Sequence, residues 1–303
     1  MKTYKAKINS LKEYTVTHKD FEQALQINKH LLQNNNYYGV CPYCDSPVQL
    51  IGLSKKVNIT AHARHTKNSI KNVANKTEQS NYCPLNTHKR DANPEDRFSI
   101  ENIHSLEVKK RFIENYDVIA KIINYYSDIF YSYNKKIELF KRAYRGKIWL
   151  FPEISQSNIP WILLYTEEPQ EITSRPIKKD STLFHDLKKI GINFTESFMK
   201  DYFLIDFKDH SKLKNTVYKL TKHQRKFNKT NDYEETFHAM LTKSKIYDIP
   251  PTEGFYTYSD KKIVIDHQEL ENKINYYNQR NSRDNILLDE IKKFLLEQGE
   301  NIQ

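Results

Sequence analysis

Cys41-Pro42-Tyr43-Cys44, followed by His62-Ala63-Arg64-His65 and later by Cys83-Pro84, is the stretch around which this 303-residue sequence is organised. It holds all three cysteines of the protein. Two cysteines separated by two residues, together with a distant histidine and a distant cysteine, supply the thiolate and imidazole ligands of a tetrahedral zinc site. We therefore expect a zinc-binding module whose metal ligands are Cys41, Cys44, His65 and Cys83, with His62 as the alternate ligand.

The expected module is a small zinc ribbon with a structural Zn²⁺. Residues 37–40, 48–51 and 57–61 have the composition of short strands, and a helix is expected to begin near Asp20. The last of these strands ends on His62, so an imidazole can arrive beside the cysteine pair. Four protein ligands leave no open position for water, so the metal is expected to hold the fold and not to do chemistry.

An alternative interpretation is an HNH-type nuclease. His62, His65, Asn86 and His88 lie near cysteines that could brace a zinc-supported catalytic fold. The sequence lacks the Asp-His or His-His pair expected on the catalytic strand of such a nuclease, which favours the structural site.

The order Cys-x-x-Cys, a strand pair, His-x-x-His and a later Cys resembles the N-terminal zinc-binding region of the competence CoiA-like bacterial proteins. The matching residues are Cys41, Cys44, His62, His65 and Cys83. Ala63 stands where that family usually has Phe, the loop before Cys83 is long, and the resemblance covers residues 37–88 only. The resemblance implies that the module binds zinc, that the partner is DNA in preference to RNA, and that the protein acts in DNA uptake, DNA processing or phage defence. Proteins with this N-terminal region often carry a restriction-type nuclease domain after it.

Composition and charge place the chain among intracellular proteins with polyanionic partners. A formal net charge of +10 favours nucleic acid over a membrane surface as the binding partner. No segment approaches the roughly 18 to 20 apolar residues that span a bilayer, and three cysteines at this spacing fit a reducing cytoplasm. Abundant Lys, Asn, Ile and Tyr beside 6 Gly suggest an AT-rich bacterial or phage gene. We expect two domains, residues 1–93 and 94–303, divided in the polar segment 90–94.

The most regular pattern of the second domain runs from Phe112 to Phe140. Apolar residues there alternate steps of four and three, which predicts a long heptad-patterned helix or a helical hairpin. Because Phe and Tyr are bulky for a two-stranded zipper, packing within the domain is favoured over the alternative, a homodimer or protein partner bound through this helix.

After residue 140, the second domain is expected to mix helices and strands. Strands are predicted at residues 148–151, 159–165 and 201–208, a helix at 233–246, a hairpin at 255–265 and helical structure at 268–296. Asp206 and Lys208 at a strand end are the local trace of a restriction-type catalytic core, in which carboxylates hold Mg²⁺ and a Lys orients water. That core needs another acid, for which Glu153, Glu167 and Asp186 are candidates.

Two basic runs are candidates for contact with a phosphate backbone. No acid lies between Asp45 and Glu78, where six cations occur, and a second run follows Lys208. A solvated basic surface is the alternative interpretation of both. The predicted nucleic-acid-binding residues are Lys55, Lys56, Arg64, Lys67, Lys71, Lys219, Lys222, Arg225 and Lys226.

The sequence thus predicts an α+β protein in which a small N-terminal zinc ribbon is joined to a larger mixed α/β body. The function predicted first is a zinc-stabilised nucleic-acid-binding protein, with DNA as the expected partner. The two alternatives are an Mg²⁺-dependent nuclease, which would use Asp206 and Lys208, and a zinc-stabilised adaptor that binds protein.

Overall fold

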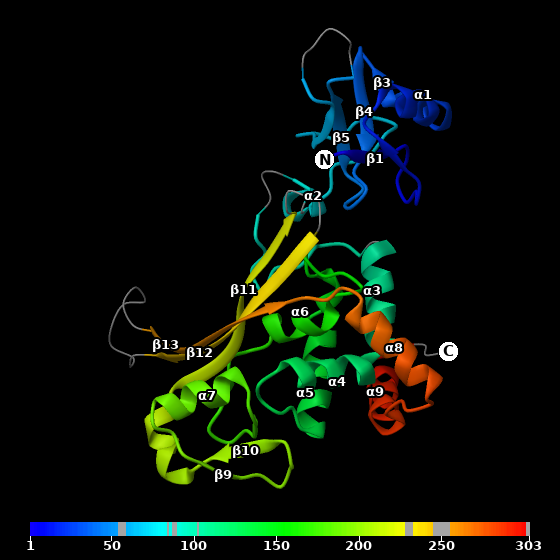
Figure 1. The fold of residues 1–303 in the computed structure, drawn as a ribbon. Coiled ribbons are helices and arrows are strands. Elements are labelled where there is room, and N and C mark those ends of the chain that lie inside the picture. The colour runs from blue at the N-terminus through cyan, green and yellow to red at the C-terminus, as the bar shows by residue number, and fades with distance from the viewer. Residues whose placement is uncertain are drawn as a thin grey trace. The chain divides into compact units, whose positions relative to one another are not determined.

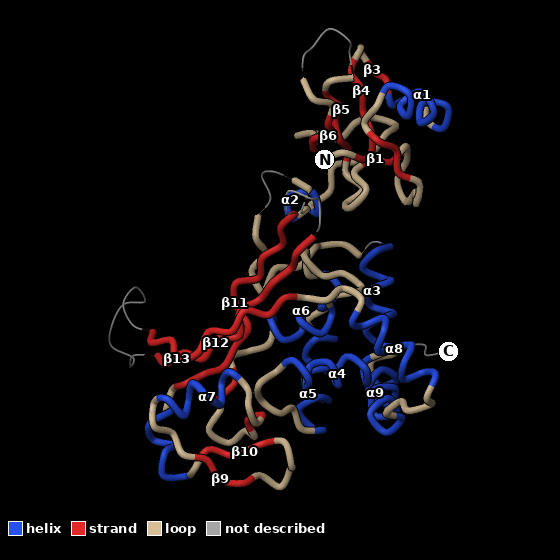
Figure 2. Tube along the Cα trace, in the orientation of Figure 1, coloured by secondary structure: helices blue, strands red, loops and turns tan. Residues whose placement is uncertain are grey.

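The computed structural model describes residues 1–53, 59–83, 85–86, 90–101, 103–227, 233–244 and 255–300 of a mixed α and β chain with antiparallel sheets (Figure 1). The chain divides into two compact units, unit 1 from Met1 to Ala92 and unit 2 from Asn93 to Gln303. Figure 2 shows that strands make up most of the regular structure of unit 1, whereas unit 2 contains most of the helices.

Unit 1 is built on one antiparallel sheet with strand order β2-β1-β4-β5-β6, and β3 pairs with β4. Its strands are β1 (Thr3–Lys5), β2 (Glu13–Thr15), β3 (Leu32–Gln33), β4 (Asn36–Val40), β5 (Pro47–Ile51) and β6 (His62–His65). Its helices are α1 (His18–Ile27), the 3-10 helix η1 (Lys29–Leu31) and α2 (Gln79–Tyr82).

The core of unit 1 lies between the sheet and α1. The Thr17 side chain caps α1 by accepting a hydrogen bond from the Asp20 amide at 3.2 Å, and Phe21 and Ala24 form the buried face of the helix. On β4, a Cβ atom at Gly39 would lie 2.5 Å from the ring of Tyr4, so only glycine lets β1 and β4 approach this closely.

Unit 2 packs a set of helices beside a four-stranded and a three-stranded sheet, with strand orders β13-β12-β11-β7 and β8-β10-β9. Its helices are α3 (Ile103–Glu114), α4 (Tyr116–Tyr126), α5 (Tyr133–Arg145), η2 (Ile148–Leu150), α6 (Ile159–Thr166), α7 (Thr182–Lys189), η3 (Phe207–Leu213), α8 (Glu269–Gln279) and α9 (Asn285–Glu297). Its strands are β7 (Gln170–Glu171), β8 (Ile177–Lys178), β9 (Phe194–Glu196), β10 (Tyr202–Ile205), β11 (Thr216–Phe227), β12 (Tyr233–Ser244) and β13 (Phe255–Val264).

The predicted heptad seam is divided among three helices and is not one long helix. Phe112, Tyr116, Ile119, Ile123 and Phe140 come from α3, α4 and α5, and all five are buried in unit 2. The Phe112 and Phe140 rings stack with their centroids 4.9 Å apart. These five side chains therefore form core, whereas Tyr133 of the same pattern is 39% exposed, so a homodimer or protein partner at this seam stays a prediction.

Four other segments differ from their predicted type. Residues 148–150 form the 3-10 helix η2, and 159–166 form the buried helix α6, where strands were expected. An apolar run of this length has no period that separates a buried helix from a buried strand, and Pro160 suits the first turn of α6. Residues 233–244 form β12 and not a helix, and 255–264 form one strand, β13, and not a hairpin.

Candidate metal centre

The turn between β4 and β5 brings Cys41 and Cys44 together. The Cys41 amide donates to the Ser46 carbonyl at 2.8 Å, and the Asp45 amide donates to the Cys41 carbonyl at 3.2 Å. Asp45 has φ of 52°, in the left-handed region that Asp tolerates better than most residues. This backbone conformation forms the tight knuckle that carries the two thiols.

Two other segments bring the remaining ligands to this knuckle. His65 ends β6, which pairs with β5 so that His65 lies opposite Val48. Cys83 directly follows α2, and the Ser46 and Thr77 hydroxyls, 2.9 Å apart, tie the knuckle to the segment before that helix. The four residues therefore come from three parts of the sequence and meet at one end of the sheet.

Cys41, Cys44, His65 and Cys83 have the geometry of a metal centre. Among the described residues, they are the group of three or more His, Cys, Asp or Glu side chains whose ligand atoms all lie within 4.8 Å of one another. The Cys41 and Cys83 sulfurs are 3.8 Å apart, and the Cys44 sulfur is 3.3 Å from His65 Nε2. Tetrahedral Zn–S bonds of about 2.3 Å place two sulfurs about 3.8 Å apart, whereas a disulfide needs about 2.05 Å. All three cysteines are free and buried.

The thiols of the cluster would have to lose protons to bind a divalent metal ion. A hydrogen bond with Cys41, then one with Cys83, lowers the pKa of Cys44. The hydrogen bond with Cys44 raises the pKa of Cys41 to about 12, and hydrogen bonds with Cys41 and Cys44 raise the pKa of Cys83. Three buried thiols thus resist becoming three thiolates unless a positive charge lies between them. The donor set and its spacing fit a divalent metal ion.

His62 lies outside the cluster. It begins β6 and pairs with Ile51, and its Nδ1 lies 2.8 Å from the Thr60 carbonyl oxygen. Successive strand residues point to opposite faces, so two residues three apart cannot both face the cysteines. The structure therefore brings His65 and not His62 to the site.

Among the described residues, the side chains considered for an HNH-type nuclease do not come together at one site. His65 belongs to the cysteine cluster, the Asn86 amide donates to the Ser80 carbonyl at 2.7 Å, and His62 contacts Thr60. His88 lies outside the described residues.

Exposed cationic side chains lie between the ligands His65 and Cys83, and one more lies just before His65. Arg64, Lys67 and Lys71 are exposed, as is Lys76. The acid of the knuckle, Asp45, is already paired with the buried Lys5 at 2.5 Å. The described part of this surface is therefore strongly cationic. Lys55 and Lys56, also predicted to bind nucleic acid, lie outside the described residues.

The second predicted basic run is divided between two faces of β11. Thr221 pairs with His238 and Gln224 pairs with Thr236, so β11 advances three residues while β12 advances two. The extra residue is a β-bulge at Lys222, whose φ is 51°. Because one extra residue inverts the alternation, Lys222 and Lys226 are exposed and Lys219 is half-buried, whereas Arg225 faces the interior.

Arg225 is a correction to the predicted nucleic-acid-binding residues. Its side chain is 0% exposed, and its Nη2 donates to Glu153 Oε1 at 2.8 Å. The other Glu153 oxygen lies 2.7 Å from His223 Nδ1, and His223 Nε2 lies 2.5 Å from Glu235 Oε1. Arg225 therefore balances charge inside unit 2, and a phosphate cannot reach it in this conformation.

Asp206 and Lys208 do not form a carboxylate metal site. The Asp206 side chain caps η3 by accepting a hydrogen bond from the Lys208 amide at 2.9 Å, and Lys208 itself is exposed. In the part of the chain that the structure describes, Asp206 joins no group of three ligand atoms. The candidate partner acids are engaged elsewhere: Glu153 with Arg225, Glu167 with Arg142, and Asp186 with Lys189. Asp206 thus has the role of a helix cap.

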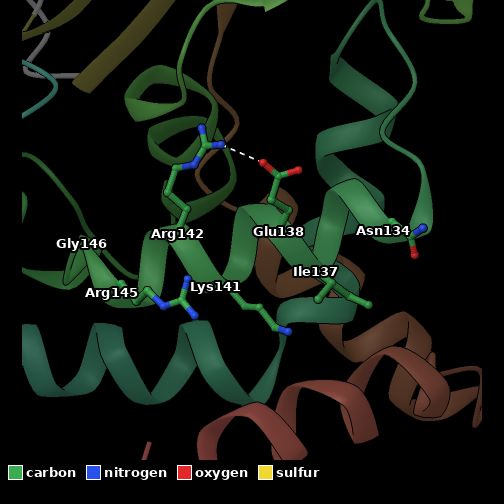
Figure 3. A pocket seen from close by; sticks show the side chains of 7 residues that line it. All are labelled: Asn134, Ile137, Glu138, Lys141, Arg142, Arg145 and Gly146. Atoms are coloured by element: carbon green, nitrogen blue, oxygen red, sulfur yellow. Dashed lines mark hydrogen bonds and ion pairs between the residues drawn. The ribbon is translucent and has the colours of Figure 1, made fainter.

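Sequence reasoning did not find a basic groove of about 800 Å³ on the exposed side of α5 (Figure 3). On α5, Glu138 pairs with Arg142 one turn later at 2.9 Å, and Glu167 also pairs with Arg142 at 3.0 Å. Lys141 and Arg145 both lie over the Phe294 ring. The acids and the ring satisfy these cations, so the groove is explained as a packing feature. Its lining residues are Asn134, Ile137, Glu138, Lys141, Arg142, Arg145 and Gly146.

Comparison of the chain with protein-family models, with curated proteins and with solved structures gives no significant match. None of the helices within the described residues is long and apolar enough to cross a membrane.

Proposed function

We propose that this chain is a zinc-stabilised nucleic-acid-binding protein and that its partner is DNA. Three thiols and one imidazole at tetrahedral spacing favour Zn²⁺ over Mg²⁺, which prefers oxygen ligands. Four protein ligands leave no open position, so the zinc has a structural role and folds unit 1 as a ribbon-like module. DNA is preferred to RNA through the resemblance to the CoiA-like proteins.

The observation that carries the proposal is the cationic segment fixed at both ends by metal ligands. Exposed Lys67, Lys71 and Lys76 lie between His65 and Cys83, with Arg64 immediately before. Ordering a basic loop on a metal reduces the entropy that it loses when it binds a phosphate backbone. On β11, Lys226 is also exposed, whereas the exposed Lys222 is paired with Asp260 at 3.3 Å.

A salt titration tests this function. We expect a fluorescent 20-base-pair duplex to bind the protein at low salt, with an affinity that falls steeply as salt rises. Replacing Lys67, Lys71 and Lys76 together by Gln should reduce the slope of log K against log salt by about 2 to 3, because each phosphate contact contributes about 0.9.

The matched control removes three exposed lysines elsewhere. Replacing Lys19 on α1 and Lys292 and Lys293 on α9 by Gln lowers the net charge equally. An effect of equal size in both triple variants would show that only net charge matters, and a wild-type protein that leaves the duplex unbound at low salt would refute the function.

A further inference from the structure

A serine, a histidine and a buried glutamate form a chain of contacts in unit 2. Ser157 Oγ lies 3.0 Å from His267 Nδ1, and His267 Nε2 lies 3.5 Å from Glu235 Oε2. Ser157 belongs to the loop before α6, His267 to the loop between β13 and α8, and Glu235 to β12. Three segments that are far apart in the sequence therefore bring these side chains together.

The position of His267 suits a general base. Serine is activated by an imidazole within about 2.6–3.2 Å of its hydroxyl, when a third group orients that imidazole. With Nε2 protonated toward the Glu235 carboxylate, Nδ1 offers its lone pair to the Ser157 hydroxyl. The contact between His267 and Glu235 is at ion-pair distance, and catalytic contacts often tighten only when substrate binds.

Glu235 is held from the side away from His267. Its Oε1 accepts a hydrogen bond from the Asn158 side chain at 2.8 Å and lies 2.5 Å from His223 Nε2, whereas Oε2 faces His267. The Glu235 side chain is 0% exposed, while that of His267 is 25% exposed and Ser157 is half-buried. The acid is thus shielded from water, and a small molecule can reach the hydroxyl and the base.

The start of α6 adds a favourable electrostatic environment. This helix begins at Ile159, two residues after Ser157. Its first intrahelical hydrogen bonds are donated by the Trp161 and Ile162 amides to the Asn158 carbonyl, so the Ile159 amide lies ahead of them. The partial positive charge of a helix N-terminus stabilises an oxyanion beside its first turn. Negative charge that develops next to Ser157 during attack is therefore favoured.

We propose that Ser157 and His267 are a catalytic pair that hydrolyses a carboxylic ester, with Glu235 as the positioning residue. This activity goes beyond nucleic-acid binding and does not depend on it. An ester suits a site with one acid–base group, because the leaving alcohol needs only the single proton that the histidine has taken from the serine.

The reaction would proceed in two steps. Ser157 Oγ forms a bond with the carbonyl carbon while its proton moves to His267 Nδ1; the ester C–O bond then breaks, and the alcohol leaves with that proton. Water next attacks the acyl-serine. Its proton passes through His267 to the departing Ser157 oxygen, which releases the carboxylic acid and restores the serine.

A fluorophosphonate probe tests the nucleophile, since a reactive serine displaces fluoride from phosphorus and keeps the label. The full chain is incubated with the probe, and peptide mass spectrometry locates the label. We expect the label on Ser157, with a rate at least about 100-fold lower in His267→Ala and in His267→Gln. Ser155→Ala is the matched control, because Ser155 is a half-buried hydroxyl 3.1 Å from Ser157, and this variant should react as wild type. Hydrolysis of p-nitrophenyl acetate should follow the same order and disappear in Ser157→Ala.

Glu235→Gln separates positioning from folding. Loss of the carboxylate should lower the labelling rate at least about tenfold while all of the protein is eventually labelled. A merely structural role would instead lower the fraction that can be labelled and leave its rate unchanged, which would contradict the role given to Glu235.

A wild-type chain that takes no label at Ser157 would overturn the inference. An equal labelling rate in both His267 variants and the wild type would also overturn it, because the serine would then react without its base. Label on Ser155 in place of Ser157 would assign the reactivity to the wrong hydroxyl and contradict the pair.

Discussion

His62 and His65 show at the scale of single residues how a strand selects a ligand. They lie three positions apart on β6, so one faces the cysteines and the other faces away. Cys44 Sγ lies 3.3 Å from His65 Nε2, whereas His62 contacts its own chain at Thr60. The two histidines therefore provide a matched pair for testing the metal site.

We expect His65→Ala to lose the bound metal and His62→Ala to keep about one zinc per chain. Metal analysis after purification without chelator gives the stoichiometry, and thermal unfolding of unit 1 gives the accompanying loss of stability. Equal zinc content in the two variants would contradict the assignment of His65.

His223 is a buried histidine of unit 2 that lies between two buried carboxylates. Burial lowers its pKa, but its hydrogen bonds with Glu153 and Glu235 outweigh burial, so the pKa of His223 is raised. With His223 protonated, two cations balance two carboxylates: His223 and Arg225 against Glu153 and Glu235. Loss of the proton removes one positive charge from this buried group, in which Glu235 also accepts a hydrogen bond from Asn158 at 2.8 Å and lies 3.5 Å from His267 Nε2.

The sign of the pH dependence follows from this raised pKa. The stability that His223 contributes is fully present below its unfolded pKa of about 6.5 and is lost as pH rises through the higher folded pKa. The free energy of unfolding of unit 2 should therefore fall above pH about 6.5, by at most about 1.4 kcal/mol per pH unit for one proton. Denaturant unfolding between pH 6 and 9 measures it, and an equal slope in His223→Gln would contradict this origin.

At the scale of elements, the bulge in β11 determines which residues face solvent. Regular alternation would have placed Lys222, Gln224 and Lys226 on the inner face that Tyr218 and Leu220 begin. The extra residue at Lys222 instead turns His223 and Arg225 inward, where Glu153 and Glu235 lie. The charges of β11 are thereby divided into a buried structural pair and an exposed basic row.

Adjacent residues of β11 should respond oppositely to the same substitution. Arg225→Met leaves Glu153 with one fewer buried cation and should cost about 3 to 5 kcal/mol of stability. Lys226→Met removes an exposed charge and should change stability by less than about 0.5 kcal/mol while weakening duplex binding. Urea unfolding and duplex titration of both variants check this. A stable Arg225→Met protein with weakened DNA binding would show that Arg225 is accessible after all.

Some elements could be predicted from sequence and others could not. The metal cluster follows from ligand chemistry, because few arrangements of Cys and His at this spacing are anything but a metal site. A one-residue bulge has no signature in the composition of a strand, so the burial of the Arg225 side chain could not be predicted from the sequence. The apolar run 159–165 lacks a period that would identify α6. The heptad seam is interrupted at Asn115 and again after Tyr126, where Ile129 forms a bridge to Ile177 of β8.

At the scale of the whole molecule, the chain divides between Ala92 and Asn93, within the polar segment 90–94 where a boundary was expected. The core of unit 1 includes the three cysteines, whereas the unit 2 residues that are described have a core of their own, rich in aromatic rings. The apolar patterns along the chain predicted an α+β protein, and the structure confirms that class. They could not bring Ser157, Glu235 and His267 together, because contacts between distant segments depend on tertiary packing that no local pattern records.

Removing the metal should therefore unfold unit 1 and leave unit 2 folded. Chelation should raise amide hydrogen exchange throughout residues 1–92 and leave residues 93–300 protected, because the metal closes the core of unit 1 alone. Hydrogen-exchange mass spectrometry of the full chain, before and after chelation, measures this. Unchanged protection in unit 1 would contradict a structural role for the metal.

The central claim joins the metal to nucleic-acid binding, and a zinc titration of the metal-free protein tests it most directly. Duplex affinity, followed by fluorescence anisotropy, should be at least about tenfold weaker without metal, since the segment between His65 and Cys83 then loses its order. Affinity should recover fully at one zinc per chain. A metal-free protein that binds the duplex as tightly as the zinc-loaded protein would contradict the account.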